Sequence, residues 1–350
     1  MLIWLVLCLA GQSRAAFAQS LPLASARDGD GVVYEGGSGP GRNKHIVFLA
    51  GDEEYRSEEG LPMLAKILAA HHGFKCTVLF SINPADGTIA PDVQTNLPGL
   101  QALDSADLCV MQLRFRQLPD EQMKHFVDYL NAGKPIVALR TSTHAFSYGT
   151  NTRSAYVKYD YRNRDWPGGF GRQVLGETWI AHHGDHGKES TRGLLNPAMT
   201  NHPILRGVTD LWAPSDVYKV LHLPNDAQVL VWGQVLSGMK PTDPPVSGPK
   251  NNPLMPVVWL RDYTGENGKT SKVVTTTMGA AVDLQNEGLR RLLINACYWA
   301  VGLEDKIPAC ADVNYVGKYK PSWFGFGQFK KGIQPADLRI GLTDMVMPDQ

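Results

Sequence analysis

The stretch GKPIVALRTSTHAF, residues 133–146, decides how the rest of this 350-residue chain is interpreted. Its apolar part, Pro135–Leu139, has the length and composition of a short buried strand, and the polar run Arg140–His144 follows at once. In an open α/β sheet, the residues just beyond the carboxyl end of a strand face the ligand crevice. A strand-to-helix elbow of this kind carries the nucleophile in several classes of hydrolase, but its tip here holds an arginine and no cysteine. The stretch therefore predicts a functional site, and this site lacks the cysteine that would be its simplest nucleophile.

The segments before this stretch alternate between strands and helices. Apolar residues at helical spacing predict two helices, at 61–71 and 119–132, and a glycine stands just past each. Compact or alternating apolar runs predict the strands 45–50, 74–80 and 108–113. Short links between strands and helices are typical of a parallel sheet that is covered on both faces. The pattern predicts the α/β class, with a doubly wound and mostly parallel sheet.

The second half of the chain is less regular. Residues 147–200 are rich in Tyr, Arg, Gly, His and Asp and show little periodicity, which predicts long loop insertions with short helices. Apolar runs then predict three more strands and a closing helix, at 229–232, 257–260, 272–277 and 289–301. The tail from Asp312 is aromatic and glycine-rich without a period, so we expect it to run over the domain surface as extended chain.

The N-terminal segment predicts an exported protein. Leu2–Ala10 is apolar but too short to span a bilayer, and Ala16-Phe17-Ala18 has the small-x-small pattern of a cleavage site. We expect a signal peptide cleaved near Ala18, a secreted or periplasmic location, and no membrane span in the mature chain. The expected organisation is a signal peptide (1–18), a flexible lead-in (19–43), one α/β domain (44–302) and an aromatic, glycine-rich C-terminal extension (303–350).

Composition and cysteine usage narrow the classes of partner. Net charge is zero and no long basic run occurs, so we expect no nucleic-acid partner. The cysteines lack the Cys-x-x-Cys spacing of a zinc ribbon or redox pair. Cys8 would leave with the signal peptide, and Cys76 and Cys109 lie in strand-like runs as buried thiols. Whether Cys297 and Cys310 pair is left open by their spacing alone.

Polar side chains follow three of the predicted strands, at the point where each strand ends. The carboxyl ends of parallel strands meet at one edge of a sheet, so we expect these side chains to share one crevice. Such a crevice suits a sugar, whose many hydroxyl groups need paired donors and acceptors. The candidates are Asp52, Glu53, Glu54, Tyr55, Arg114, Arg116, Arg140, Thr141, Ser142, Thr143 and His144, together with Asp216 and Tyr218 from a later segment.

The candidate catalytic residues within this set are His144, Arg140 and Glu54. His144 is the candidate general acid or base, and Arg140 and Glu54 would hold the substrate. The alternative for Arg140 is a buried salt bridge to Asp52 or Glu54. Acidic and hydroxyl side chains after a strand also cap the helix that follows, which is the alternative for Asp52, Glu53, Glu54, Ser142 and Thr143. The alternative for His144 is a histidine at a helix start that bonds to the backbone.

The sequence HHGDH at 182–186 is a second cluster. Three histidines in five residues seldom arise from packing alone, and a loop can gather imidazoles and a carboxylate around a divalent ion. We therefore take His182, His183 and His186 as candidate ligands of a divalent, zinc-like metal, with direct binding of the substrate as the alternative.

Taken together, these motifs resemble the ThuA-like (trehalose-utilisation) family, which belongs with the flavodoxin-like, class I glutamine amidotransferase-like folds. The resemblance runs from about Lys44 to Gly302. It rests on GDEEYRSEE (51–59), GKPIVALRTSTHAF (133–146), VLGETWIAHHGDHGKESTRG (174–193), NHPILRGV (201–208), SDVY (215–218), MPVVWLRDY (255–263) and TTTMGAAVDLQNEGLRRLLINACYWAVG (275–302). The resemblance implies a sugar-related role. Since Arg140 stands where the amidotransferases have a cysteine, it also implies that amidotransferase chemistry is absent.

Two hypotheses follow for the function. The first is an exported enzyme that acts on a carbohydrate or keto-glycoside by acid–base chemistry, with or without a metal. The reaction would be that of a lyase, a hydrolase or an isomerase. A keto group lowers the pKa of the neighbouring C–H bond. His144, acting as a single base, can therefore support elimination or isomerisation without a covalent nucleophile. The second is a non-catalytic carbohydrate-binding protein on the same fold. In a third interpretation the aromatic tail is a docking segment of a homo-oligomer.

Overall fold

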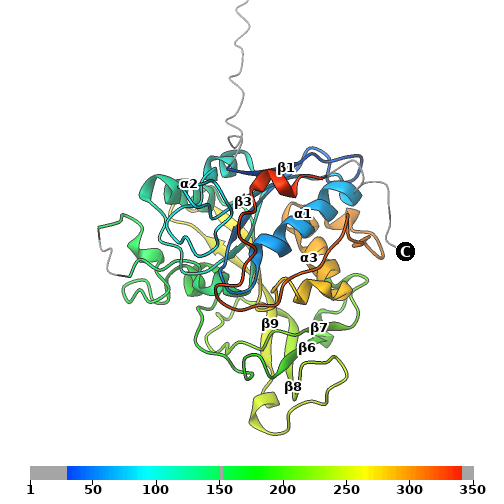
Figure 1. The fold of residues 1–350 in the computed structure, drawn as a ribbon. Coiled ribbons are helices and arrows are strands. Elements are labelled where there is room, and N and C mark those ends of the chain that lie inside the picture. The colour runs from blue at the N-terminus through cyan, green and yellow to red at the C-terminus, as the bar shows by residue number, and fades with distance from the viewer. Residues whose placement is uncertain (1–29, 150–152, 341–350) are drawn as a thin grey trace, which may run out of the picture.

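The computed structural model describes residues 30–149 and 153–340, and the predicted signal peptide lies outside them. Ten strands of the described ranges form one sheet in the order β1-β3-β2-β4-β5-β10-β9-β8-β6-β7 (Figure 1). The strands are β1 (Gly31–Tyr34), β2 (His45–Gly51), β3 (Lys75–Phe80), β4 (Leu108–Leu113), β5 (Ile136–Leu139), β6 (Ser190–Leu195), β7 (Leu211–Ala213), β8 (Gln228–Leu236), β9 (Met255–Thr264) and β10 (Thr270–Thr276).

The sheet is mixed. Five neighbouring strands are parallel: β3, β2, β4, β5 and β10. If only these five are numbered along the chain, their order in the sheet is 2-1-3-4-5. The five remaining neighbouring pairs within the described ranges are antiparallel, so the prediction of a mostly parallel sheet is wrong. Parallel neighbours need long crossovers, whereas the short turn between β9 and β10 and the loops of the second half allow antiparallel pairing.

Helices cover both faces of the parallel part. Helices α1 (Ser57–His72) and α3 (Glu287–Ala300) pack in one hydrophobic core, and α2 (Asp120–Asn131) packs in the other. Strand β2 divides its side chains between them, because successive residues of a strand point to opposite faces: Ile46 and Phe48 belong to the first core, Val47 and Leu49 to the second. Burial on both faces explains the continuous apolar run of this strand.

The predicted helix ends agree with the structure. Gly73 follows α1 with φ +79°, and its backbone N–H donates to carbonyls of the last turn. Gly133 follows α2 with φ +72°. Residues with a Cβ seldom adopt this left-handed conformation, so glycine at these positions ends each helix at little cost.

Two segments of the structure differ from the expected loops. Gly31–Tyr34, expected within a flexible lead-in, forms β1 and pairs antiparallel with β3. Ser190–Leu195, expected among long loops and short helices, forms β6 between β8 and β7. Both strands are short, and β6 begins with Ser, Thr, Arg and Gly, so neither shows the apolar alternation by which strands are recognised.

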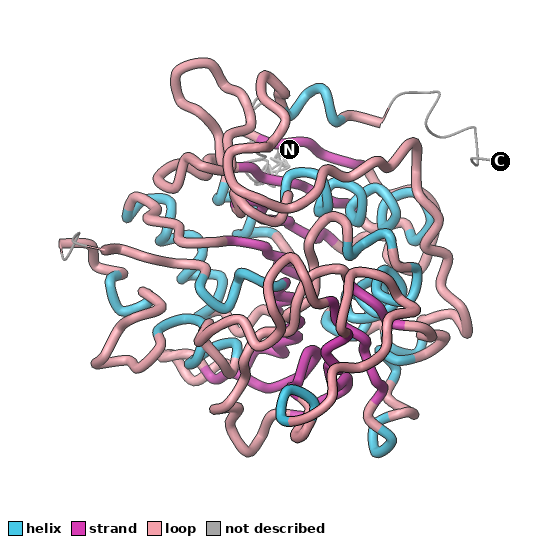
Figure 2. The backbone as a smooth tube through the Cα atoms, turned by 60° about the horizontal axis from the view of Figure 1, so that its bottom comes forward, coloured by secondary structure: helices cyan, strands magenta, loops and turns pink. Residues whose placement is uncertain are grey.

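The described part of the C-terminal tail passes α1 as extended chain, as expected, and then forms the short helix η10 (Pro335–Leu338) (Figure 1). The Ser322 backbone N–H donates to Glu59 Oε2 at 2.6 Å, and the Tyr319 hydroxyl donates to the Ala281 carbonyl at 2.7 Å. Loops account for much of the remaining surface around the sheet (Figure 2). No helix in residues 30–149 and 153–340 has the length and apolarity needed to cross a membrane.

The described cysteines are unpaired. Cys76, Cys109 and Cys297 are buried, and Cys310 is exposed. The structure therefore contains no bond between Cys297 and Cys310, the pairing that the sequence left open.

Candidate site at the strand ends

The carboxyl ends of β2, β4 and β5 meet in one place, as predicted. Backbone hydrogen bonds continue past the strands: Arg114 N–H donates to the Gly51 carbonyl at 2.9 Å, and Phe115 N–H donates to the His144 carbonyl at 3.0 Å. The chain goes to one side of β2 for β3 and returns to the other side for β4, so this edge is a topological switch point. Open α/β sheets bind ligands at such points.

Asp52 ties the three strand ends together. Its Oδ1 accepts the backbone N–H groups of Glu54 and Tyr55 at 2.8 and 3.1 Å, and its Oδ2 accepts from Gln112 at 3.2 Å and from the Thr141 hydroxyl at 2.7 Å. Asp52 and Thr141 have no exposed surface. Both were predicted to bind substrate, but their polar atoms are engaged within the protein, so the structure gives them a structural role.

Two further candidates are also held inside the protein. The Ser142 hydroxyl donates to the Met111 carbonyl at 3.0 Å and accepts the Leu113 N–H at 3.3 Å. Arg116 is fully buried and pairs with Glu53 at 2.9 Å, while its other nitrogens reach carbonyl oxygens of neighbouring loops. Neither side chain is placed to touch a ligand.

Arg140 lies beneath the site. Its guanidinium lies between the rings of Tyr55 and Tyr218, 4.1 and 4.3 Å from their centroids. Its Nη2 donates to Asp216 Oδ1 at 2.9 Å and to the Tyr55 hydroxyl at 3.0 Å, and its Nη1 donates to the Thr277 carbonyl at 2.8 Å. Arg140 is fully buried, so the predicted substrate contact is wrong. The alternative of a buried ion pair holds, with Asp216 in place of Asp52 or Glu54.

Asp216 also holds two of the three clustered histidines. Its Oδ2 accepts from His182 Nδ1 at 2.7 Å and its Oδ1 from His186 Nδ1 at 3.0 Å. Burial raises the pKa of Asp216, but Arg140 and the two imidazoles outweigh burial and hold it below the ordinary value. The ionised carboxylate can only accept, so both rings donate from Nδ1 to Asp216.

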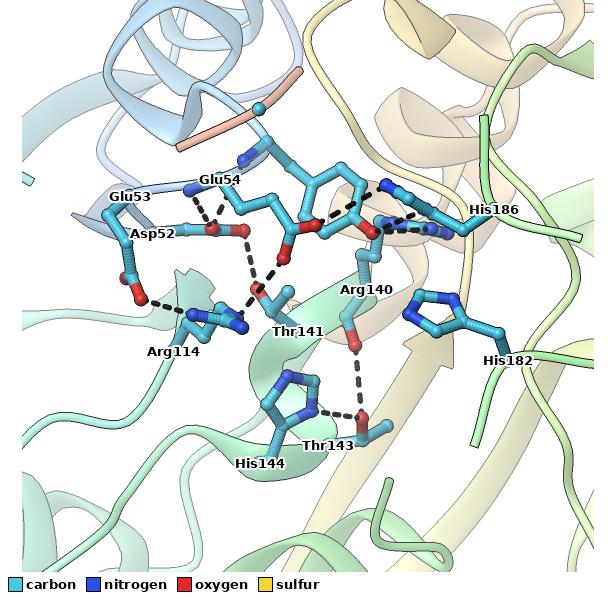
Figure 3. Close-up of polar contacts among 12 residues, drawn as sticks. Asp52, Glu53, Glu54, Arg114, Arg140, Thr141, Thr143, His144, His182 and His186 are labelled. Atoms are coloured by element: carbon cyan, nitrogen blue, oxygen red, sulfur yellow. Dashed lines mark hydrogen bonds and ion pairs between the residues drawn. The ribbon is translucent and has the colours of Figure 1, made fainter. Parts of the chain in front are cut away.

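His183 differs from its two neighbours. Its Nε2 lies 2.7 Å from the Lys250 carbonyl, outside the cluster, so its prediction as a metal ligand beside His182 and His186 is wrong. The backbone explains the difference, since a loop rather than a helix carries these residues and His182 alone pairs with Tyr218 in an isolated bridge. Figure 3 shows His182 and His186 turned toward the strand ends.

The remaining cluster has donor types that suit a metal. Ligand atoms of His182, His186 and Asp216 lie within 4.8 Å of one another. Imidazole and carboxylate are ligands that a zinc-like ion accepts. The charge of Asp216 is already matched by Arg140 at 2.9 Å, however, and a cation would lie beside this buried guanidinium. The contacts of 2.7 and 3.0 Å are also ordinary hydrogen-bond lengths, so the geometry favours a hydrogen-bonded network over a metal centre.

His144 is a neutral base in this geometry. Its Nδ1 lies 3.2 Å from the Thr143 hydroxyl, which donates its own proton to the Arg140 carbonyl at 3.2 Å (Figure 3). The hydroxyl oxygen therefore accepts from Nδ1–H, and Nε2 is left unprotonated. Burial, followed by the charges of Arg114 and Arg140, holds the pKa of His144 well below its ordinary value.

Glu54 lies across the same space. Its Oε2 is 3.3 Å from Arg114 Nε, and its Oε1 is 3.6 Å from His186 Nε2. Burial raises the pKa of Glu54, although Arg114 opposes this shift. Figure 3 shows Glu54, Arg114, His144, His182 and His186 arranged around a common centre, and we call these five residues the strand-end site.

A chain of ring contacts surrounds the strand-end site and contains residues that the sequence analysis did not single out. Neighbouring members lie 4.4–5.8 Å apart, measured between ring centroids or from the Arg114 guanidinium to a ring. We call this chain the aromatic rim: Phe324, His186, His182, Trp179, His144, Phe115, Arg114 and Phe326. The tail aromatics were visible in the sequence, but nothing local placed them beside residues of the first half.

Comparison with protein-family models identifies one family for this chain. The sequence model of ThuA, described as trehalose utilisation, matches residues 46–300. A ThuA-like protein of known structure from Parabacteroides merdae is 16% identical, covers 74% of this chain and 90% of its own, and has a TM-score of 0.49. Another from Bacteroides uniformis is 14% identical, covers 76% of this chain and 95% of its own, and has a TM-score of 0.45. Among curated proteins, no match is found.

Proposed function

The chain belongs to the ThuA family, and from this premise we propose that it is an exported enzyme that acts on a carbohydrate or keto-glycoside by acid–base chemistry. The observation that carries the proposal is the neutral imidazole of His144, whose Nε2 makes no hydrogen bond with any described residue and which shares the strand-end site with Glu54 and His186. We also assign the sheet to the doubly wound, flavodoxin-like class, which the 2-1-3-4-5 order of the parallel strands supports.

The reaction needs one base and one acid. In a keto-glycoside, the carbonyl acidifies the adjacent C–H bond, and His144 Nε2 takes that proton. The C–H electron pair forms a C=C bond, the glycosidic C–O bond breaks, and the leaving oxygen takes a proton from Glu54, whose raised pKa favours the protonated form. This sequence is an elimination. Addition of water across the C=C bond of its product completes a hydrolysis. If the C–O bond stays intact and the deprotonated carbon bears a hydroxyl, the enediolate takes the proton back at the former carbonyl carbon, which is an isomerisation.

The remaining groups of the site bind the substrate or hold other side chains in position. Arg114 and Glu54 offer donors and acceptors to sugar hydroxyls, and the aromatic rim offers apolar surface to the C–H face of a sugar ring. Arg140 touches no ligand and is a positioning residue, because it holds Asp216, which in turn orients His182 and His186.

Replacing His144 tests this function. We expect His144→Ala and the closer isostere His144→Gln to lower kcat/KM for 3-keto-trehalose by at least about 100-fold, because general-base catalysis is worth that much. In the wild type, activity should persist as the pH falls through 6.5, since the pKa of His144 lies well below its ordinary value. Steady-state kinetics across pH measure both effects.

His183→Ala is the matched control, since this ring bonds the Lys250 carbonyl outside the site. It should retain wild-type activity. His144→Ala leaves a cavity at a buried position and should melt earlier, so His144→Gln, which fills more of that space, is the variant to compare as a folded protein. Full activity in a folded His144→Gln protein would contradict the proposed role.

The aromatic rim also favours a second candidate function, a non-catalytic carbohydrate-binding protein. Rings and charged groups around one centre suit sugar binding whether or not a bond is broken. Sugars and keto-glycosides that raise the melting temperature without forming product would favour this candidate over the enzyme.

A further inference from the structure

We propose that the tail segment Trp323–Phe326 is a binding subsite for the second sugar ring of a disaccharide, and that it selects glycosides by the ring that does not react. This inference rests on the proposed function in one respect: the reacting ring is taken to occupy the strand-end site. It adds residues from the far end of the chain to the determinants of specificity.

The tail is fixed to the strand-end site by backbone contacts. The Gly325 N–H donates to the Glu54 carbonyl at 2.8 Å, and the Gly325 carbonyl accepts from Arg56 Nη2 at 2.7 Å. Phe324 is buried, with its ring centroid 5.4 Å from that of Tyr55 and 5.3 Å from that of His186. Phe324 therefore anchors this part of the tail as a wall of the site.

The two aromatic residues beside this anchor are left open to solvent. Trp323 stacks on Phe324 at 4.8 Å with an interplanar angle of 26°, and it is 51% exposed. Phe326 lies 4.9 Å from the guanidinium of Arg114 and is 59% exposed. Across residues 30–149 and 153–340, the other exposed large apolar side chains are Val33 and Leu221. Two exposed aromatics within four residues, one stacked on the anchor Phe324 and the other on Arg114 of the site, indicate a surface that a ligand covers.

The chemistry of this surface fits a sugar ring. A pyranose has an apolar C–H face and a periphery of hydroxyls, so it needs an aromatic platform with polar groups beside it. Trp323, stacked on Phe324, and Phe326, over the Arg114 guanidinium, each offer an aromatic face, and Arg114, paired with Glu53 and Glu54, provides the polar groups.

The position of this surface indicates that it binds the second ring of the disaccharide. Trp323 makes its ring contact with Phe324, and Phe324 in turn contacts His186. One anchoring ring thus separates Trp323 from the strand-end site, so a ligand spanning both places must continue beyond its reacting ring.

The test compares a disaccharide with its single-ring analogue. The probes are trehalose and methyl α-glucoside for equilibrium binding by calorimetry, and their 3-keto derivatives for kinetics. Trp323→Ala and Phe326→Ala should each raise Kd and KM for the disaccharide by about threefold to tenfold, the value of one aromatic contact. In Trp323→Ala, whose ring lies outside the aromatic rim and contacts Phe324, methyl α-glucoside binding and kcat should change little. Val33→Ala, which alters an exposed residue on β1, is the control and should match the wild type.

The outcomes separate this inference from the proposed function. Loss of disaccharide binding in the variants supports the subsite even when no keto-glycoside is turned over, in which case the enzyme proposal alone fails. Equal effects of Trp323→Ala on both sugars, or no effect on either, overturn the subsite. Sedimentation adds one more outcome: a wild-type dimer that Trp323→Ala disrupts without changing sugar binding would show that the segment is a self-association surface, and would also overturn the inference.

Discussion

Asp216 is the residue on which the strand-end site depends most. It is fully buried and is bonded to Arg140, His182 and His186 at once, so a single carboxylate neutralises a buried cation and orients two imidazoles. Burying two charges costs several kcal/mol for each ion, and this cost is recovered only while both partners are present.

Asp216→Asn should therefore destabilise the protein severely. The amide keeps the shape of the carboxylate but leaves Arg140 as an uncompensated buried charge, which costs about 3–5 kcal/mol. Urea unfolding at pH 7 measures the loss of free energy of unfolding.

Asp185→Asn is the matched control, because Asp185 is an exposed partner of Lys250 in the loop that carries His182 and His186. It should cause little measurable change. A wild-type free energy of unfolding in Asp216→Asn would show that Arg140 does not depend on this carboxylate.

At the scale of elements, the position of His144 depends on two short helices packed against each other. The 3₁₀ turn η2 (Arg140–His144) follows β5, and the π-helix η4 (Gly171–Leu175) packs on it. A Cβ added at Gly171 would lie 2.0 Å from the Thr143 carbonyl oxygen, a backbone atom of the turn that carries His144. Only glycine allows this close approach.

Gly171→Ala should push η2 out of place. Overpacking of this kind costs about 1–3 kcal/mol of stability. Since Thr143 and His144 move with the turn, we also expect weaker binding of sugars to the strand-end site. Thermal unfolding and calorimetry measure the two effects.

Gly37→Ala is a fair comparison, because nothing lies within 4 Å of a Cβ built there and the residue has no positive φ. It should change stability by less than about 0.5 kcal/mol. Equal melting temperatures for the two variants would mean that η2 adapts to η4 without cost.

For the whole molecule, one buried carboxyl group, that of Glu58, adds its own pH dependence to the stability. Glu58, in the first turn of α1, is only 8% exposed, and neither of its carboxyl oxygens has a hydrogen-bond partner among the described residues. Burial raises the pKa of Glu58 from 4.5 to about 8. The folded protein therefore binds this proton more tightly than the unfolded chain does. The resulting stabilisation is complete below pH 4.5 and is lost as the pH rises to about 8.

Glu58→Gln should remove this dependence. The variant and the wild type should have similar melting temperatures at pH 4.5, while at pH 8.5 the variant should be more stable by a few kcal/mol, on the order of the shift of its pKa. Calorimetric melts at both values measure the difference.

Glu35→Gln, at an exposed position, is the control and should follow the wild type at both pH values. A gap between Glu58→Gln and the wild type that is the same at both pH values would show that Glu58 does not titrate in this range.

The amino-acid sequence by itself determined the parallel part of the sheet, helices α1 and α2 with their glycine ends, and the gathering of polar residues at the strand ends. These features are readable because hydrophobic period and helix caps are local properties of the chain. The same patterns missed β1, β6 and β7, which are too short or too polar to show a period, and could not tell that β8, β9 and β10 would pair antiparallel.

Only the tertiary structure decided which side chains meet. Arg140 pairs with Asp216, 76 residues later in the chain, rather than with Asp52 or Glu54, because the later segment brings a carboxylate beneath the elbow. His182 and His186 turn inward while His183 turns away, and Phe324 reaches Tyr55 from the far end of the chain. These contacts depend on how distant segments pack, which no local pattern encodes, and the proposed chemistry of the site depends on them.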